Sequence, residues 1–430
     1  MSTSGRSRGW RVGGWLLAGA LAVAPSGAQP QFLTDEVQVN GDSRSRQRAP
    51  IAVKVDGERT LVVWQEDRHG VFGRLLDATG APLGEDLALA PSTRHSSPYY
   101  GVTRERRDPA AVALAGGGVL VAWTQEQQQL STFPFIESRR LLASAVYAQV
   151  FDPTGEPAGP ARRLERAPGV VQRVPELAVL ADGRVLAAWL SELDHGTAAV
   201  RARLLDAGGV PAGESFELGV ATNDATGGLG LTAHPDGVAL ATWHACCDAG
   251  GDAGVFARIV DPEDPSSGAV VRVNDVQEHS QAEPAAAVLA DGELLVVWSS
   301  STGIPDPLYH RRRVRGQRLA VDGTLLGGES ELSAGFGWGH TTPDLAVGPE
   351  GEVLLTWLVW NADFPVAVRA RALDADGEPH GAPFAVNASR AVGFPSVSTL
   401  GDGLMVVTWI GITERQRAVS ARFLQVSDEE

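Results

Sequence analysis

The sequence is poor in lysine and in long apolar runs. Lys54 is the only lysine, and arginine supplies the other basic residues. After the first 28 residues no apolar run approaches the roughly 18 residues that a membrane-spanning helix needs, so we expect no membrane insertion. The net charge of −16 repels phosphate backbones, which makes nucleic acid a poor partner. Helical periodicity is also absent from this part of the chain, which favours an all-β fold.

Signals for metal ions and cofactors are missing as well. No DxDxDG-type calcium loop occurs, and the nine histidines show no metal-ligand spacing. We therefore expect no cofactor, with calcium as the one alternative. The only cysteines, Cys246 and Cys247, are adjacent, and in an oxidising compartment they could form a vicinal disulfide or remain two free thiols.

Residues 1–28 have the organisation of a secretory signal peptide. Arg6, Arg8 and Arg11 are basic, residues 15–24 are apolar, and small residues precede Gln29. We predict a cleaved Sec-type signal, a secreted or periplasmic protein, and a mature chain (residues 29–430) that forms a single domain.

A sequence repeat organises the mature chain. Seven tryptophans, 52 to 66 residues apart, each end a short apolar run such as LVVW or VLAAW. A tight turn such as ADGR precedes each run, and in all copies but the fourth an earlier run is opened by proline. We number the repeats 1 to 7 by these tryptophans: Trp64, Trp123, Trp189, Trp243, Trp298, Trp357 and Trp409.

Each repeat predicts four antiparallel strands. A third strand such as VRARLLD and a second glycine-containing turn follow the tryptophan, and a fourth, alternating strand ends the unit. The second strand is apolar at nearly every position, so both of its faces must be covered by neighbouring sheets. The sequence therefore predicts a seven-bladed β-propeller of four-stranded antiparallel blades.

The ends of the chain predict how the ring closes. The seventh repeat stops after its third strand, and residues 35–40 near the mature N-terminus resemble a fourth strand. We expect this N-terminal strand to pair in the seventh blade, which removes an open sheet edge.

Two repeated residues are interpreted as structural. The tryptophans should fill the gap between diverging blades. An arginine in the third strand could stack on the indole ring. This arginine position is assigned to Arg74, Arg203, Arg258, Arg371 and Arg422, with Gln149 in repeat 2 and Arg318 in repeat 5.

Candidate binding residues lie where the repeats differ, in the loops that follow each tryptophan or join the blades. Repeats 5 and 6 form an aromatic sector that suits a sugar or a peptide. Its members are Tyr309, His310, Trp338, His340, Trp360, Asp363 and Phe364. In repeat 2, residues 124–144 and the long segment before this repeat could form a lid or a docking lobe.

Acidic residues recur just after the tryptophans and could form a ring at the mouth of the axial channel. Such a ring could hold Ca²⁺ or attract a cationic ligand, although solvated loop charge is the simpler interpretation. The candidates are Glu66, Glu126, Glu192, Asp248 and Glu414.

The repeat pattern, P-x-x-A-V-L-x-D-G-x-h-V-V-W followed by A-R-L-L-D-x-x-G-x-P-x-G (h is apolar), resembles bacterial secreted propeller repeats. That resemblance implies a fold and a cell-envelope or extracellular location, but one fold hosts many activities. With no nucleophile, metal or cofactor motif, we expect a non-catalytic, monomeric binding protein for an extracellular glycan or protein. An enzyme acting on extracellular polysaccharide, a glycosidase or lyase, is the alternative; its candidate acid and base groups are Glu126, Glu192, Asp363 and His340.

Overall fold

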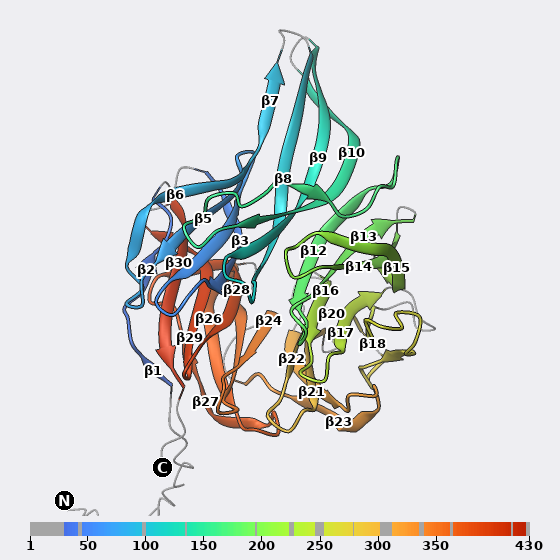
Figure 1. Cartoon of the computed structure of the whole chain (residues 1–430). Helices are drawn as coiled ribbons and strands as arrows, with labels where there is room; N and C mark the ends of the chain where they lie inside the picture. Colours follow the sequence, from blue (N-terminus) through green and yellow to red (C-terminus); the bar gives the residue numbers. More distant parts are fainter. Residues whose placement is uncertain are drawn as a thin grey trace, which may run out of the picture.

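The structure, a computed structural model, describes residues 30–41, 45–96, 100–133, 136–193, 196–222, 228–245, 253–277, 279–301, 312–334, 339–361, 364–413 and 416–426. No helix occurs in these residues, and hence none that could cross a membrane. The strands form antiparallel sheets arranged around a common axis (Figure 1), so the chain is an all-β propeller as predicted. The signal-peptide prediction falls on residues 1–28, outside the described ranges.

Repeats 1 to 4 form separate sheets whose strands follow the chain order from the axis outward. Repeat 1 contains β3 (Gln47–Lys54), β4 (Thr60–Glu66), β5 (Gly70–Leu76) and β6 (Pro82–Pro91). Repeat 2 contains β7 (Thr93–Ser96), β8 (Tyr100–Ala113), β9 (Val119–Phe133), β10 (Ile136–Phe151) and β11 (Arg162–Arg163). Repeat 3 contains β12 (Gln172–Val179), β13 (Val185–Glu192), β14 (Thr197–Leu205) and β15 (Pro211–Thr222). Repeat 4 contains β16 (Leu229–Ala233), β17 (Ala239–Ala245), β18 (Gly254–Val260) and β19 (Val270–Arg272).

Repeats 5 and 6 share one eight-stranded sheet. A single parallel bridge between Arg312 and Gly339 joins their two antiparallel halves. The first half contains β20 (Gln281–Val288), β21 (Leu294–Ser301), β22 (Arg312–Leu319) and β23 (Leu325–Glu331). The second half contains β24 (Gly339–Val347), β25 (Val353–Asn361), β26 (Phe364–Leu373) and β27 (Pro379–Ala385). The prediction of seven separate blades is therefore corrected: five sheets stand alone, and the sixth is double because this bridge extends its hydrogen bonding.

The N-terminal segment completes the sheet of repeat 7, as predicted. This sheet contains β28 (Arg390–Gly401), β29 (Leu404–Thr413) and β30 (Gln416–Gln425). Both β1 (Gln31–Phe32) and β2 (Val37–Gln38) pair antiparallel with β30. The Asn40 side-chain oxygen also accepts the Val419 N–H at 2.8 Å, and the Glu36 carboxylate accepts the Ala388 and Ser389 N–H groups at 3.0 and 2.9 Å. The two ends of the described chain are thus tied into one sheet.

The hydrophobic core is divided among the interfaces between successive repeats. The indole of Trp243, for example, packs among residues of repeat 3 such as Leu218, and Trp64 packs against Ile410 and Phe423 of repeat 7. All seven tryptophans are at most 2% exposed, and each lies in an apolar cluster shared with the preceding repeat. The prediction that they fill the gaps between blades is confirmed.

The repeated arginine ties adjacent sheets together through hydrogen bonds. Arg203 donates to the Gly213 carbonyl of its own fourth strand and to the Leu164 carbonyl of repeat 2, both at 2.6 Å. Arg74, Arg258, Arg371 and Arg422 reach the preceding repeat in the same way, at the carbonyls of Val39, Leu218, Leu332 and Val386.

The assignment of Arg318 to this position is wrong by one residue. Gln317 pairs with Val296, two residues before Trp298, which is the register that Arg203 has with Ala187 in repeat 3. The shorter Gln317 side chain donates to the Leu326 carbonyl of its own fourth strand. Arg318 therefore points to the other side of β22, toward repeat 6.

Candidate functional site

The candidate site is built around a circle of inner strands. The first strand of each repeat contacts that of the next, and the circle closes from repeat 7 back to repeat 1. Its members are β3, β8, β12, β16, β20, β24 and β28. We call the end where the second strands finish the loop face, and the opposite end, with the glycine-containing turns, the turn face.

A bulge before the repeated proline shapes the inner strands. In every repeat with that proline, the preceding residue has a positive φ of 45–57° and the pairing register shifts there. Repeat 4 has no proline, and β16 pairs with β17 without a shift. Left-handed backbone at a non-glycine residue is strained, but because six repeats share it, it belongs to the fold and marks no single site. The residues are Ala49, Asp108, Val174, Glu283, Thr342 and Phe394.

Polar side chains of the preceding repeat satisfy several of these bulges. The Asp108 N–H donates to Gln65 Oε1 at 3.1 Å, and the Val174 N–H donates to Thr124 Oγ1 at 3.2 Å. The Thr342 N–H donates to the Glu283 carboxylate at 2.8 Å. Much of the polarity at this level therefore serves to align neighbouring sheets.

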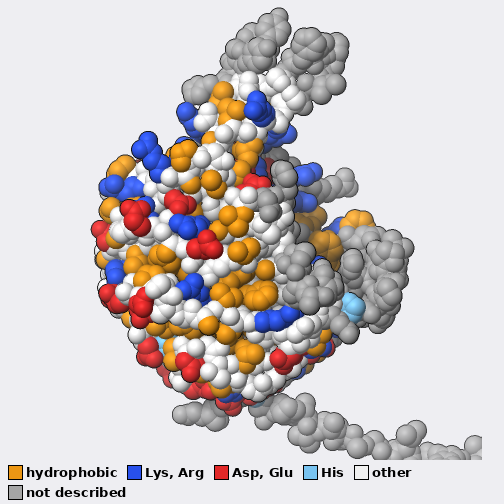
Figure 2. Space-filling model, turned by 90° about the vertical axis from the view of Figure 1, so that its right-hand side faces the viewer, with side chains coloured by type: hydrophobic (Ala, Val, Ile, Leu, Met, Phe, Trp, Pro, Cys, Tyr) orange, Lys and Arg blue, Asp and Glu red, His pale blue; other side chains and the backbone are white. Residues whose placement is uncertain are grey.

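Repeat 2 carries a long arm that rises from the body of the ring (Figure 1). The residues predicted to form a lid or lobe are continuous extensions of β8, β9 and β10, with β7 paired to β8. The expectation of two loops is thus corrected, because the extra residues continue the ladder of the sheet. Basic side chains, all of them arginines, gather on this projection (Figure 2), where Arg94, Arg104, Arg139 and Arg140 are exposed.

A cluster of arginines and carboxylates lies at the base of the arm. Glu105 accepts from Arg107 at 3.1 Å and from Arg139 at 2.9 Å, and Arg107 also lies 3.5 Å from Glu126. Burial raises the pKa of Asp108, an effect that the charge of Arg107 opposes and that of Glu126 reinforces. The Glu126 charge is therefore close enough to raise the pKa of Asp108 further.

Two further carboxylates lie on inner strands of the circle. Glu176 on β12 and Asp344 on β24 each follow the repeated proline, on opposite sides of the ring. Asp344 accepts the Val397 and Leu345 N–H groups at 2.9 and 3.0 Å, and burial raises its pKa to about 6. Burial, with a smaller contribution from the Asp344 charge, raises the pKa of Glu176 to about 8. Asp344 thus contacts the inner strand of repeat 7, and its charge still contributes to the raised pKa of Glu176.

The described part of the aromatic sector divides into surface and core. Phe364 is 61% exposed on the loop face, and the Arg390 guanidinium lies 5.5 Å from its ring centroid. Trp360 is half-buried and donates its indole N–H to Thr341 Oγ1 at 2.7 Å. His340 is fully buried, 2.8 Å from Ser333 Oγ, so its side chain packs inside the sheet instead of facing the mouth.

The predicted acidic ring is only partly described. Glu66 and Glu192 end the second strands of their repeats and are half-buried, and Glu126 joins the arginine cluster described above. Among the described residues, no three His, Cys, Asp or Glu side chains come together as metal ligands. The remaining candidates lie outside the described residues: Cys246, Cys247, Asp248, Tyr309, His310, Trp338, Asp363 and Glu414.

The sequence interpretation missed the carboxylates on the inner strands. Asp108, Glu176, Glu283 and Asp344 stand next to the repeated proline, in strands interpreted only as core. A signal was present, because repeats 3 and 6 have PEL and PDL where repeats 1 and 2 have PIA and PAA. An acidic residue at an otherwise apolar repeat position was the clue.

Comparisons with known proteins support the fold. No family model matches the chain, and no curated protein matches its sequence. A protein of unknown function from Dyadobacter fermentans has a similar structure (12% identity, TM-score 0.52, covering 92% of this chain and 98% of that one). So does an ulvan lyase of polysaccharide lyase family PL25 bound to -[GlcA(1-4)Rha3S]- (10% identity, TM-score 0.55, covering 91% and 96%). The phage phi92 endosialidase is also similar (8% identity, TM-score 0.50, covering 93% and 70%). At these identities the likeness is one of fold alone.

Proposed function

We propose that this chain is a secreted, non-catalytic binding protein that holds an anionic glycan on its loop face. The observation that carries this proposal is the arginine-rich arm of repeat 2. Residues 93–107 and 125–144 contain six arginines and three glutamates, in a chain whose net charge is −16. Four of those arginines are exposed, at the positions given above.

The geometry of the arm explains how an acidic protein could attract an anion. Charges farther apart than about 8–10 Å are largely screened at physiological ionic strength. Arginines on a projection therefore act on a nearby ligand more strongly than the acidic body does. Guanidinium groups also match carboxylate and sulfate oxygens in paired geometry.

An aromatic contact on the same face suits a sugar ring. Phe364 is exposed and has the Arg390 guanidinium beside it, so one residue pair offers both a stacking surface and a positive charge. Leu141 and Leu142, at the edge of the arm, are 41% and 44% exposed and add apolar contact area. The ulvan lyase of similar fold was solved with a ligand that carries uronate and sulfate, which guides the choice of probe.

The test compares two double variants that remove the same charge. We expect Arg104→Ala/Arg140→Ala to weaken binding of a sulfated polyuronate at least 10-fold and to flatten the salt dependence of the affinity, because two ionic contacts with its sulfate or carboxylate groups are lost. Arg162→Ala/Arg166→Ala, also exposed but outside the arm, should leave both unchanged. Equal effects of the two double variants, in calorimetric titrations at several salt concentrations, would show that only net charge matters.

One observation favours the alternative, a glycan-acting enzyme. Asp108 is half-buried with a raised pKa near the Glu126 carboxylate, and such a pair can act as acid and base. Prolonged incubation with the same polyuronate separates the two functions. A binding protein leaves the polyuronate intact. An enzyme would cleave it and create new chain ends, and the variant Asp108→Asn would no longer do so.

The remaining expectations belong to the same proposal. The chain is exported with removal of residues 1–28, so Cys246 and Cys247 reach an oxidising compartment in which they can pair. The protein acts as a monomer and needs no metal ion. The two halves of the eight-stranded sheet behave as separate blades, so that the propeller has seven blades. The seven apolar clusters, one between each pair of successive repeats, support this number.

A further inference from the structure

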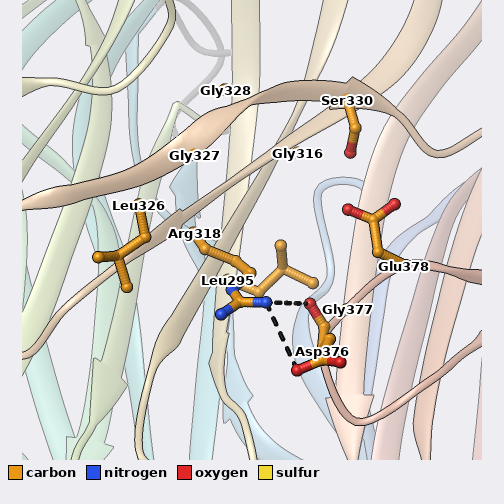
Figure 3. Close-up of a pocket in the computed structure, with 10 residues that line it drawn as sticks. All are labelled: Leu295, Gly316, Arg318, Leu326, Gly327, Gly328, Ser330, Asp376, Gly377 and Glu378. Atoms are coloured by element: carbon orange, nitrogen blue, oxygen red, sulfur yellow. Dashed lines mark hydrogen bonds and ion pairs between the residues drawn. The ribbon is translucent and has the colours of Figure 1, made fainter.

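A polar groove lies on the turn face, between repeats 5 and 6 (Figure 3). It has a volume of about 250 Å³ and is bounded by β22 and β23 on one side and by the turn of residues 376–378 on the other. Arg318, Ser330 and Glu378 contribute side chains to it, and Gly316, Gly327 and Gly328 line it with backbone. None of these residues belongs to the loop-face site.

The groove exists because repeat 5 departs from the repeat at two positions. The first is the third-strand residue that pairs with the residue three before each tryptophan. Its occupants in repeats 1 to 7 are Leu75, Val150, Leu204, Ile259, Arg318, Ala372 and Phe423. Arg318 is the only charged residue among them, so the apolar contact with the next repeat is missing here.

The second departure is in the fourth strand. Ser330 pairs with Gly316, whereas the equivalent pairs are Phe216 with Ala202 in repeat 3 and Phe384 with Ala370 in repeat 6. Two of the repeats thus have a phenylalanine ring where repeat 5 has a hydroxymethyl group beside a glycine. This exchange removes the side-chain volume that would otherwise fill the groove.

The charged side chains that line the groove, one arginine and two carboxylates, carry a net negative charge. Arg318 Nε donates to the Glu293 carboxylate at 2.6 Å, and its Nη1 lies 3.5 Å from Asp376 Oδ1. The guanidinium is therefore already neutralised. Glu378 projects from the other wall (Figure 3) and forms no ion pair among the described residues.

A backbone position that lines the same groove lacks the arginine donor of its counterparts. In repeats 1, 3 and 6 the repeated arginine donates to the carbonyl of a glycine in the fourth strand: Gly84, Gly213 or Gly381. In repeat 5 the shorter Gln317 donates to Leu326 instead, one residue before the equivalent Gly327. The backbone at Gly327 is thus left without the donor that its counterparts have.

We propose that this groove binds a small cationic ligand with hydroxyl groups, of the size of an amino sugar. The ammonium group would pair with the carboxylate of Glu378, because Arg318 already holds that of Asp376. The hydroxyl groups would hydrogen-bond with Ser330 and the backbone at Gly327. This inference is independent of the anionic-glycan site, which lies on the opposite face and takes ligands of the opposite charge.

Glucosamine is the probe, and glucose is its uncharged counterpart. We expect saturable binding of glucosamine to the full chain by calorimetric or NMR titration, with glucose at least 10-fold weaker. Ser330→Phe, which restores the ring of repeats 3 and 6, should weaken glucosamine binding at least 10-fold without lowering the unfolding midpoint. Glu378→Gln should weaken it by a similar factor and leave glucose binding unchanged.

The matched control is Glu156→Gln, at the equivalent turn position of repeat 2, where the backbone N–H likewise donates to the turn aspartate. It should bind glucosamine as the unmodified chain does. The proposal is overturned by absence of saturable glucosamine binding, or by binding that survives both Ser330→Phe and Glu378→Gln. The arm variant Arg104→Ala/Arg140→Ala should not affect glucosamine, which keeps this test separate from that of the proposed function.

Discussion

Replacing Trp243 by alanine is expected to lower the free energy of unfolding by about 3–5 kcal/mol. The indole is 1% exposed, packs against Leu218 of repeat 3, and donates its N–H to the Val220 carbonyl at 2.9 Å. The gap cannot close easily, because the sheets on both sides are held in register by the rest of the ring. Chemical denaturation of the variant and the unmodified chain measures the difference.

A tryptophan outside the repeat position gives the control. Trp360→Ala removes the same atoms from a half-buried site on the loop face, so we expect a loss of about 1 kcal/mol or less. Trp243→Phe should lower the free energy of unfolding by an amount between these two losses, because it keeps a ring in the gap but loses the hydrogen bond. If Trp243→Ala and Trp360→Ala were equally destabilising, the assignment of Trp243 as the filler between sheets would be wrong.

The second large effect is a loss of stability as the pH rises from about 4.5 to 8. The pKa of Glu176 is raised from 4.5 to about 8, mainly by burial and secondarily by the charge of Asp344. The folded chain therefore binds this proton more tightly than the unfolded chain does. Its stabilising contribution is fully present below pH 4.5 and is lost as the pH rises through the folded value.

Glu176→Gln should remove this dependence. Each unit of pKa corresponds to about 1.4 kcal/mol, so the variant should be more stable than the unmodified chain by roughly 1–4 kcal/mol at pH 8 and nearly equal to it at pH 4.5. Asp344, with a pKa of about 6, adds a loss confined to the lower part of the window, which remains in the variant.

Glu214→Gln is the matched control, an exposed carboxylate of the same repeat that should change neither stability nor its pH dependence. Both variants are compared by denaturation curves between pH 4.5 and 8. If Glu176→Gln and Glu214→Gln changed the pH dependence of stability equally, the assignment of a raised pKa to Glu176 would be wrong.

The repeating features of the fold were predictable from the sequence because each depends on local spacing. Seven tryptophans at the end of apolar runs identified the second strands, and turns such as that of Asp206 were recognised by their composition. The Asp206 carboxylate accepts the Gly208 and Val210 N–H groups at 3.0 and 2.8 Å, which satisfies the backbone of this turn. The error at Arg318 arose where VRGQRLAVD departs from the common pattern, since a one-residue slip moves a side chain to the other face of the sheet.

The candidate sites were less predictable. Glu176 and Asp344 are 168 positions apart in the chain, and only closure of the ring brings their charges together. The arm was expected to be loop, although its residues continue a ladder already begun in the propeller. The groove beside Ser330 depends on the register that pairs Ser330 with Gly316 and Arg318 with Leu295, which only the folded sheet decides.

By itself, the sequence determined the repeat, the order of strands in each unit and the closure by the N-terminal segment. These follow from apolar periodicity and turn chemistry, which act over a few residues. The tertiary structure alone decided that the charge of Asp344 acts on Glu176, that the arm projects from the ring and where a missing side chain leaves a groove. Those properties depend on the distance between residues remote in the chain, and distance in space is set by packing of the whole ring.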